Sequence, residues 1–363
     1  MKSVKIVQSG DFHLDSPLAL HHMEFRKKRR EELLQAFSGI IDRSIRISAD
    51  LLLLTGDIFD SKRVTQITLE FLHKEMDRFP GRIFISPGNH DPYTAESPYA
   101  YHRFPENTHV FREYEEIYIP ELDCLVCGQG FTDLYEEKNQ LEGKMSLHEA
   151  EIKILVMHGE VTTGTNVYNP ITRESIERSG FSYIALGHRH DFSGIQKAGQ
   201  TSYAYAGIPE GRGFDELGDK GIIEGTIYKD GTNLSFRKMN RRSYRQLPVD
   251  VSDVLTTAEI TLKILSQIDQ RNDIYKITLT GEVPSYVSIN IQDIEKELEF
   301  KLSDFSLSDN TMVKDRFEKF GDNSLKGLFM KTIEEKRELS SLDTALLEEA
   351  ANLGLRILSQ EDF

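Results

Sequence analysis

Polar side chains of the kinds that bind metal ions occur where predicted strands end. The most compact example is the segment 88–91 (Gly-Asn-His-Asp), which follows the apolar run Arg82–Ser86 and Pro87. An amide oxygen, an imidazole and a carboxylate therefore stand side by side at the turn after a buried strand. Open α/β sheets bind their ligands at such strand ends. Taken alone, the segment is equally consistent with an ordinary polar turn, so its interpretation depends on the other strand ends.

Four further strand ends carry the same residue types. Asp11 and His13 follow the first predicted strand, and residues two apart on an extended segment point the same way, so both can reach one point. His188 and His190 repeat this spacing after a later strand. Glycine lies within two residues of each group and lets the backbone turn sharply there. The candidate metal ligands are Asp11, His13, Asp57, Asn89, His158, His188 and His190.

This set of donors indicates a particular chemistry. Mixed imidazole and carboxylate ligands suit Mn, Fe or Zn better than Ca or Mg. The ligands are too many for one tetrahedral site, but they suit two ions that share a bridging carboxylate and clamp the attacking and leaving oxygens at phosphorus. A single histidine is usually structural, whereas so many donors at successive strand ends favour a metal centre. The histidines without such a placement are expected to be structural: His21, His22, His73, His102, His109 and His148.

Alternating strands and helices must position these donors. The run Leu51–Leu54 is typical of a strand buried on both faces, and Arg30–Ser48 has apolar residues at helical spacing. This rhythm predicts a layered α/β domain with a largely parallel sheet. From His109 to Gln129, short alternating segments indicate antiparallel strands or a second sheet. A hairpin about Asp230-Gly231 closes the domain near residue 245.

The pattern after residue 245 differs. We expect an α/β domain that carries the candidate ligands over 1–245, a small α+β domain over 246–312, and a linker with a helical tail over 313–363. Several apolar residues of the tail fall on one helical face. That face either packs on its own domain or docks into the groove of a partner. The residues on this face include Leu342, Leu346, Ala350, Leu353 and Ile357.

The charge balance speaks against a nucleic-acid partner. The formal net charge is −15, whereas phosphate contacts come from Lys and Arg. Carboxylates that bind metal ions contribute to this negative count, which weakens the objection. The one dense basic block, Arg26–Arg30, is expected to be the solvated start of a helix rather than a phosphate-binding patch.

Composition and cysteine usage predict a cytoplasmic protein. The chain is 39% hydrophobic and 28% charged, as in soluble globular proteins. Its apolar runs fall short of the ~20 residues of a membrane span, and the N-terminus runs straight into a strand without a signal-peptide pattern. Cys124 and Cys127 lie in a predicted strand. Since a redox pair would need a helix start, we expect structural thiols.

Five motifs, in order over residues 11–190, resemble the signature of calcineurin-like metallophosphoesterases. They are Asp-x-His, Gly-Asp-x-x-Asp, Gly-Asn-His-Asp, His-Gly after a strand, and Gly-His-x-His. The resemblance implies a layered α-β-β-α sandwich with a small α+β capping domain and a helical C-terminal tail. Within the superfamily, the chain looks like the SbcD/YhaO type of DNA-repair exonuclease subunit. The supporting segments are 11–17 (Asp-Phe-His-Leu-Asp-Ser-Pro) and 205–211 (Tyr-Ala-Gly-Ile-Pro-Glu-Gly), the latter ahead of Phe214-Asp215-Glu216.

The resemblance also implies roles for single residues. It makes Asp57 the bridging ligand and places His90 at the scissile phosphate, as general acid or transition-state contact. Asp60 lies where many relatives have a carboxylate that orients this histidine, although some nuclease relatives have histidine there. Asp91 and the pair Ser61-Lys62 depart from the protein-phosphatase pattern. One metal would bind Asp11, His13, Asp57 and His190, and the other Asp57, Asn89, His158 and His188.

The function implied by the resemblance is an Mn²⁺-dependent nuclease acting on DNA ends. Its partner would be an SMC-like coiled-coil ATPase (SbcC-type), the chain would form a homodimer, and no membrane would be involved. The small domain would cap the active site and guide DNA. A phosphodiesterase or phosphatase for a small nucleotide, with the same two metals, is the alternative that the acidic charge favours. A third possibility is a DNA-end tether with a vestigial metal site, against which the intact ligand set speaks.

Overall fold

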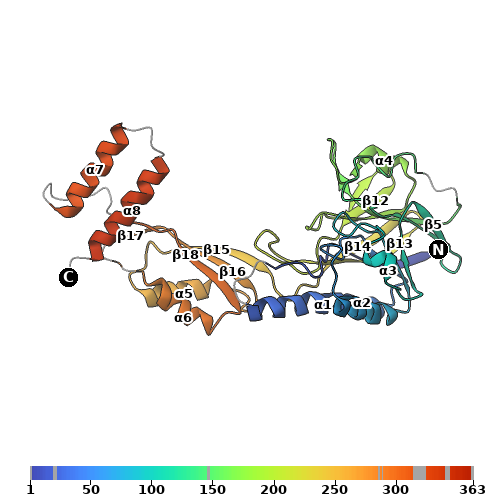
Figure 1. Cartoon of the computed structure of the whole chain (residues 1–363), viewed down its shortest axis with the longest axis horizontal. Coiled ribbons are helices and arrows are strands. Elements are labelled where there is room, and N and C mark those ends of the chain that lie inside the picture. Colours follow the sequence, from blue (N-terminus) through green and yellow to red (C-terminus); the bar gives the residue numbers. More distant parts are fainter. Residues whose placement is uncertain are drawn as a thin grey trace. The chain divides into compact units, whose positions relative to one another are not determined.

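The structure is a computed structural model that describes residues 2–18, 23–144, 148–284, 287, 289–313, 324–339 and 344–360. Contacts within the chain define two compact units, Met1–Ser243 and Tyr244–Phe363. Figure 1 shows the elements of each unit.

The first unit contains two six-stranded sheets, each parallel in its centre and antiparallel toward an edge. The strand order of the first sheet is β14 (Gly231–Lys238), β13 (Gly221–Tyr228), β1 (Ser3–Ser9), β2 (Leu51–Leu54), β3 (Arg82–Ile85) and β4 (Thr108–Val110). The strand order of the second sheet is β11 (Gln196–Ala198), β12 (Thr201–Tyr205), β10 (Tyr183–Gly187), β7 (Ile152–His158), β6 (Cys124–Gln129) and β5 (Glu115–Ile119).

Alternating side chains of the central strands give this unit its layers. Leu52 and Leu54 of β2 pack toward helices α1 (Met23–Arg46) and α2 (Gln66–Asp77), whereas Leu51 and Leu53 face the second sheet, as the period of two in a strand requires. On the far side of the second sheet, a third apolar cluster includes Ile176 of α4 (Arg173–Arg178). The expected α-β-β-α sandwich is therefore confirmed, and the run 51–54 is buried on both faces.

The remaining elements of this unit are short. Helix α3 spans Pro98–Tyr101, and strands β8 (Glu160–Val161) and β9 (Pro170–Ile171) pair in parallel with each other.

The predicted hairpin consists of β13 and β14, which are joined through the pairing of Tyr228 with Gly231. Strand β4 joins the first sheet, and the expected second sheet therefore begins at β5.

The two cysteines are free and buried. Cys124 belongs to the cluster between the sheets and Cys127 to the cluster on the outer face, because residues three apart in a strand point to opposite faces. Burial raises the pKa of both thiols to about 12. These thiols are therefore inert, in agreement with the expected structural role.

One residue of the basic block 26–30 departs from the predicted solvated helix start. Lys27, Lys28 and Arg30 are exposed, but the side chain of Arg29 is 1% exposed. Its guanidinium pairs with Glu32 and donates hydrogen bonds to Glu210 at 2.9 Å and to the Gly211 carbonyl at 2.7 Å. The prediction of a solvated block is wrong for this residue because its side chain lies on the core-facing side of α1 and meets two carboxylates there.

Replacing Arg29 with alanine should therefore destabilise the first unit. Removal of one member of a buried ion-pair network leaves uncompensated charge, and we expect the free energy of unfolding to fall by about 3–5 kcal/mol. Denaturant unfolding of the full chain, followed by circular dichroism, measures the change. The matched control is Lys28→Ala, one residue away and exposed, which should change the free energy by no more than about 0.5 kcal/mol. Equal effects of the two substitutions would contradict a structural role for the buried network.

The second unit is built on a parallel sheet. Strands β15 (Tyr244–Asp250), β16 (Ile274–Thr280) and β18 (Asp304–Asp309) pair in register. Helices α5 (Thr257–Ser266) and α6 (Ile291–Glu299) contribute to one apolar cluster with this sheet. Strands β17 (Glu282–Val283) and β19 (Met312–Val313) form a short parallel pair. Among the described residues, no helix combines the length and apolar character that crossing a membrane requires.

Two helices end the described chain, α7 (Leu325–Leu339) and α8 (Thr344–Gln360). They pack closely where a Cβ on Gly354 would lie 2.1 Å from the Phe329 ring, and Figure 1 shows them side by side. Asn352 of α8 donates to the Thr311 carbonyl at 2.9 Å and accepts from the Val313 N–H at 2.8 Å. These bonds hold α8 against β19.

Helix α8 has two apolar faces. Leu347, Ala351 and Leu355 are buried. The face singled out in the sequence is exposed instead, with Leu346 at 58%, Leu353 at 60% and Ile357 at 50% exposure. On α7, Leu325 and Leu328 are also exposed. We call Leu325, Leu328, Leu346, Leu353 and Ile357 the tail stripe. Leu342 lies outside the described residues.

Candidate metal centre

The predicted ligands lie at strand ends of both sheets. Asp11, Asp57 and Asn89 follow β1, β2 and β3 of the first sheet, whereas His158 ends β7 and His188 follows β10 of the second. Because neighbouring parallel strands end at the same edge, the two sets of loops meet between the sheets. Donor atoms lie within 4.8 Å of one another in three overlapping groups: Asp11, His13 and His190; Asp11, Asp57 and His158; and His13, Asp57 and His90.

The backbone at these positions is held in an unusual conformation. Asp11, His13 and Asp57 have φ angles of 52°, 45° and 47°, and His188 has a φ of 109°. Such left-handed conformations cost on the order of 1–3 kcal/mol each and cluster at functional sites. Here backbone hydrogen bonds fix them, since the Asp11 N–H donates to the Gly56 carbonyl at 2.8 Å and the His13 N–H to the Asp57 carbonyl at 2.9 Å.

Asp91 locks the loops after β2 and β3 together. Its buried carboxylate accepts N–H bonds from Asp57 at 3.1 Å, Ile58 at 2.7 Å and Gly88 at 2.7 Å, and the Tyr99 hydroxyl donates to it at 2.6 Å. Glycine is required at 88, because a Cβ there would lie 2.2 Å from Asp57 Oδ1. Asp91 thus holds the turn that presents Asp57, and its own oxygens are occupied by donors.

Hydrogen bonds set the tautomer of His158. Its Nδ1 lies 2.8 Å from the Thr55 carbonyl, which can only accept, so the proton is on Nδ1. In the neutral ring Nε2 then carries a lone pair, and it faces Asn89 Oδ1 at 3.1 Å and Asp57 Oδ2 at 3.5 Å. In that form three electron-pair donors point at one another. This arrangement is what a bound cation requires.

The rings of His13 and His190 show the same arrangement. His13 Nδ1 lies 3.2 Å from Asp60 Oδ1, and His190 Nδ1 lies 2.8 Å from Glu216 Oε1. Each Nδ1 therefore donates to a carboxylate. The two Nε2 atoms then meet at 3.3 Å, each with its lone pair toward the other. Two such lone pairs repel unless a cation lies beside them.

Burial and charge lead to the same conclusion. The side chains of Asp11 and Asp57 are 2% exposed. Burial raises the pKa of Asp11 well above its usual value, and the charge of Asp57 adds to the increase. Burial acts upward on Asp57 too, but positive charge on the neighbouring rings of His158 and His13 outweighs burial and lowers the pKa of Asp57. Burial lowers the pKa of His13, which favours loss of the ring proton when a metal binds.

The donor set therefore fits divalent cations. Asp11, His13 and His190 can hold one ion, and Asp57 lies between this group and His158 with Asn89. His188 is placed differently, because its N–H donates to Asp11 Oδ1 at 2.9 Å and its ring lies 5.3 Å from that of His158. Its ring nitrogens are not among the three clustered groups of the described residues. The division of ligands between the two ions stays a prediction.

His90 lies at the mouth of the centre, and its side chain is 45% exposed. The N–H of His90 donates to Asp57 Oδ1 at 2.9 Å, and its ring lies 4.6 Å from that of His13. The carboxylate of Asp60 lies 4.0 Å from His90 Nδ1, farther than the Asp60 carbonyl at 3.3 Å. The orienting role of Asp60 toward His90 therefore stays a prediction. The carboxylate of Asp60 lies closest to His13, at 3.2 Å from its Nδ1.

Sequence reasoning missed two charged residues at the centre. Arg212 pairs with Glu216 at 2.6 Å and lies 3.6 Å from Asp60 Oδ1. Burial would raise the pKa of Glu216, but the bonds from His190 and Arg212 lower it to about 2, so this carboxylate is charged. In the sequence, the segment Phe214-Asp215-Glu216 supports the family resemblance but does not indicate a role for Glu216. The signal that could have indicated the Arg212–Glu216 pair is their spacing of four residues in a glycine-rich segment.

Replacing Glu216 with glutamine should weaken metal binding. Glu216 holds the His190 tautomer, and loss of a partner of this kind lowers metal affinity by roughly 10- to 100-fold. Calorimetric titration of the metal-free chain with Mn²⁺ measures the affinity directly. The control is Asp215→Asn, which changes an exposed neighbour and should leave binding unchanged. If Glu216→Gln binds Mn²⁺ like the unmodified chain, the carboxylate does not act through His190.

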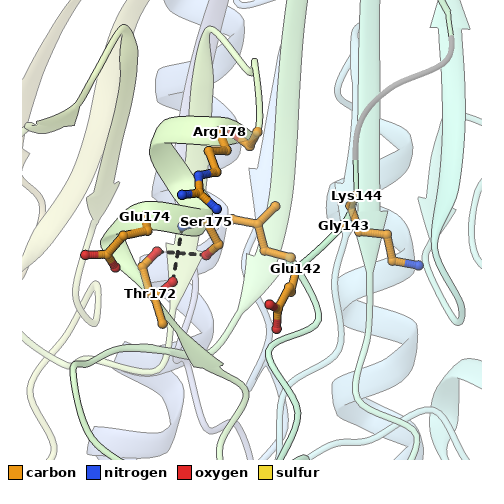
Figure 2. Close-up of a pocket in the computed structure, with 9 residues that line it drawn as sticks. Glu142, Gly143, Lys144, Thr172, Glu174, Ser175 and Arg178 are labelled. Carbon is orange, nitrogen blue, oxygen red and sulfur yellow. Dashed lines mark hydrogen bonds between the residues drawn. The ribbon is translucent and has the colours of Figure 1, made fainter.

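A separate hollow of about 390 Å³ lies beside α4. Figure 2 shows Glu142, Glu174 and Arg178 around it. Thr172 and Ser175 bond to each other there, because Thr172 caps α4 and accepts from the Ser175 N–H at 3.1 Å. Thr172 and Ser175 thus serve the helix end, and the lining of the hollow does not include the candidate ligands.

The fold and the site together are those expected of a two-metal phosphoesterase. Facing sheets of a sandwich place neutral imidazoles, buried carboxylates and an amide oxygen around one point, beside an exposed histidine. A model of the calcineurin-like phosphoesterase family matches residues 4–192, just over half of the 363 residues. The chain belongs to the calcineurin-like phosphoesterase family.

Two relatives share part of the sequence. The chain is 25% identical over 269 residues to the uncharacterized metallophosphoesterase YhaO of Bacillus subtilis, covering 70% of this chain and 64% of that protein. It is 24% identical over 210 residues to the DNA double-strand break repair protein Mre11 of Methanocaldococcus jannaschii, covering 53% of this chain and 55% of that protein. The matches thus span less than two thirds of either relative.

Solved structures also resemble part of the chain. The protein TT1561 of Thermus thermophilus aligns with a TM-score of 0.39 at 13% identity, covering 64% of this chain and 98% of that chain. A dimetal phosphatase from Danio rerio aligns with a TM-score of 0.43 at 9% identity, covering 64% of this chain and 99% of that chain.

Proposed function

We propose that the chain is a two-metal phosphodiesterase that cleaves DNA at its ends, with Mn²⁺ as the metal. The observation that carries the proposal is the contrast between the buried donors and His90. Asp11, His13 and Asp57 are almost fully buried, whereas His90 stands half exposed directly beside them. A substrate phosphate can therefore reach both the centre and a side chain able to transfer a proton.

The residues divide the work of hydrolysis between them. The buried donors around Asp57 would hold two divalent cations, which would supply an acidified water and offset the charge that develops at phosphorus. Thr55, Asp60 and Glu216 hold the protons of the three liganding rings on Nδ1, which keeps each Nε2 directed at the centre. His90 donates a proton to the departing sugar oxygen. Its Nδ1 lies 3.3 Å from the Asp60 carbonyl, a contact that orients the ring and leaves Nε2 for the substrate.

The choice of DNA rests on the relative named for double-strand break repair and on the resemblance to SbcD/YhaO-type nuclease subunits. The net charge of −15 favours the second candidate, a phosphodiesterase or phosphatase for a small nucleotide. Both candidates use the same centre, so substrate size separates them. A homodimer and a cytoplasmic location belong to the first candidate by resemblance alone.

A direct comparison of substrates tests the proposal. The full chain with Mn²⁺ is given nicked plasmid, end-labelled single strands, bis-(4-nitrophenyl) phosphate and small nucleotides. We expect loss of the DNA end label and hydrolysis of the diester, both abolished by a chelator. Rapid turnover of small nucleotides with intact DNA would establish the second candidate. Metal binding without hydrolysis of any of these substrates would favour a tethering role.

We also propose that the tail stripe binds a coiled-coil ATPase of the SMC type. Its five apolar side chains are each at least half exposed. Leu346, Leu353 and Ile357 share one face of α8 by their spacing, and an exposed apolar helix face is uncommon unless a partner covers it. Amphipathic helices dock such faces against the groove of a partner. The opposite face of α8 is already used within its own unit, so the exposed face is available without unfolding the tail.

Paired substitutions test this partner. Leu353→Glu with Ile357→Glu should abolish co-purification with a co-expressed coiled-coil ATPase while leaving folding and diester hydrolysis intact. Leu262→Glu on α5, 65% exposed, is the matched control and should retain the partner. If the tail variant binds the ATPase as well as the control does, the tail stripe is not the docking surface.

A further inference from the structure

A cleft of about 450 Å³ adjoins the metal centre. This volume lies within the range of about 300–1,000 Å³ that is typical of ligand sites. Asn89 and His90, which border the centre, also line the cleft. The rest of the lining comes from the loop after β2, from residues 134–135 after β6, and from Tyr168 just before β9. The lining residues are Asp60, Ser61, Lys62, Arg63, Asn89, His90, Leu134, Tyr135 and Tyr168.

One wall of the cleft is aromatic and fixed in place. The backbones near Tyr135 and Tyr168 are tied together, since the Glu136 N–H donates to the Val167 carbonyl at 2.8 Å and the Asn169 N–H to the Glu136 carbonyl at 2.7 Å. The two tyrosine rings lie 6.1 Å apart. Tyr135 is nonetheless 60% exposed. A large aromatic ring that lines the cleft is therefore open to solvent instead of being packed into the core.

The aromatic wall continues to the metal centre. The ring of Tyr168 lies 5.0 Å from that of His188, with an angle of 36° between the ring planes. The His188 ring in turn lies 5.3 Å from that of His158. A flat ligand resting against Tyr135 would thus have its substituents within reach of the centre.

The other wall is basic, although the chain as a whole is acidic. Lys62 and Arg63 are exposed and line the cleft. Lys62 lies 3.8 Å from Glu96, whose side chain is 81% exposed, and such surface pairs contribute little and exchange readily. Asp60 is the one carboxylate among the lining residues that the structure describes, and Arg212 lies 3.6 Å from it. The cleft therefore combines a stacking face with cations suited to phosphate.

We infer that this cleft binds an unpaired nucleobase of a nucleic-acid strand, stacked on Tyr135, with the adjoining phosphates between Lys62, Arg63 and the metal centre. This inference rests on the proposed function and specifies its substrate. Proteins that bind single strands combine a basic groove with aromatic rings on which bases stack. A base inside a duplex has both faces covered, so the cleft selects frayed or single-stranded ends.

Binding of short strands tests the inference. Fluorescence anisotropy is measured with an eight-nucleotide single strand and with the same strand carrying abasic residues at both ends. Ca²⁺ replaces Mn²⁺, and gel analysis verifies that the strands are intact. Loss of one stacked base weakens binding by roughly 5- to 150-fold, so Tyr135→Ala should weaken binding of the normal strand by this factor. The abasic strand should bind Tyr135→Ala and the unmodified chain equally.

Two variants separate stacking from structural damage. Tyr135→Trp keeps a stacking surface and should retain the affinity of the unmodified chain. Tyr101→Ala removes a ring of similar exposure, 56%, outside the cleft lining, and should have no effect. Equal loss for normal and abasic strands, or no loss with Tyr135→Ala, would overturn the inference.

A nucleotide arm keeps this result apart from the proposed function. A 5′-mononucleotide that binds as tightly as the strand, and with the same dependence on Tyr135, would overturn the assignment to a nucleic-acid strand. Together with intact DNA in the Mn²⁺ assay, it would identify the chain as a small-nucleotide enzyme. Cleavage of DNA by a Tyr135→Ala variant with unchanged strand affinity would instead support the proposed function and reject the stacking site.

Discussion

Replacing Asp57 with alanine should remove both metal ions at once. Its carboxylate lies 3.5 Å from His158 Nε2 and 3.8 Å from His13 Nε2, so one side chain faces the donors of both predicted sites. Two-metal centres hold their ions about 3.5–4 Å apart, a separation that a single bridging carboxylate can serve. After Mn²⁺ loading and dialysis, elemental analysis should show that the metal content falls from two ions per chain to none. Diester hydrolysis should be lost together with the ions.

The comparison variant is His13→Ala, which removes a donor of one predicted site. This variant should bind one ion more weakly and retain the other. Circular dichroism is needed for both variants, because Asp57 also accepts the His90 N–H at 2.9 Å. A folded Asp57→Ala chain that keeps one tightly bound ion would refute the bridging role and redistribute the ligands.

Replacing His90 with alanine should separate chemistry from metal binding. We expect both ions to remain, because the buried donors do not depend on this exposed ring, and turnover to fall by roughly 10²- to 10⁴-fold, the contribution of a positioned proton donor. The loss should appear in kcat rather than in KM. Hydrolysis of bis-(4-nitrophenyl) phosphate should be affected less, since its leaving group needs no proton.

The control for this variant is His148→Ala. That ring is 64% exposed, contacts Glu116 at 2.7 Å, and does not belong to the donor groups. The His148→Ala variant should turn over substrate at the rate of the unmodified chain. Near-normal DNA cleavage by metal-loaded His90→Ala would mean that His90 shapes the turn and transfers no proton.

The strand ends could be predicted because the chemistry there is local. The run Leu51–Leu54 is buried on both faces, and such a strand has to end in a turn at the sheet edge. Parallel strands share that edge, so polar residues next in sequence converge even though they are far apart along the chain. This reasoning places Asp11, His13 and Asp57 together, as the structure does.

Side-chain partners across loops could not be predicted in the same way. Whether the Asp60 carboxylate points to His13 or His90 depends on a rotation within a turn, and distances of 3.2 and 4.0 Å distinguish the two. Glu216 lies far from His190 along the chain, and nothing in its local pattern indicates the contact. Such pairs depend on the packing of several loops and leave no periodic signal.

Periodicity also fails where two interpretations are equally good. Arg29 lies four residues before the buried Leu33, so its position on α1 faces the core, but its charge suggested solvent. On α8 the sequence offers one apolar face through Leu353 and another through Leu355. Which of the two is buried depends on where β19 lies, and this tertiary information is absent from the helix itself.

The origin of the ligands in two sheets has a further consequence. Bound metal would connect the loops after β1–β3 to those after β7 and β10. It would thus cross-link the two sheets of the sandwich. A ligand that binds only the folded chain stabilises it by about 2.7 kcal/mol at a free concentration one hundred times its Kd. The stability of the folded chain would then rise with the supply of metal, and the metal-free chain would be digested faster by proteases.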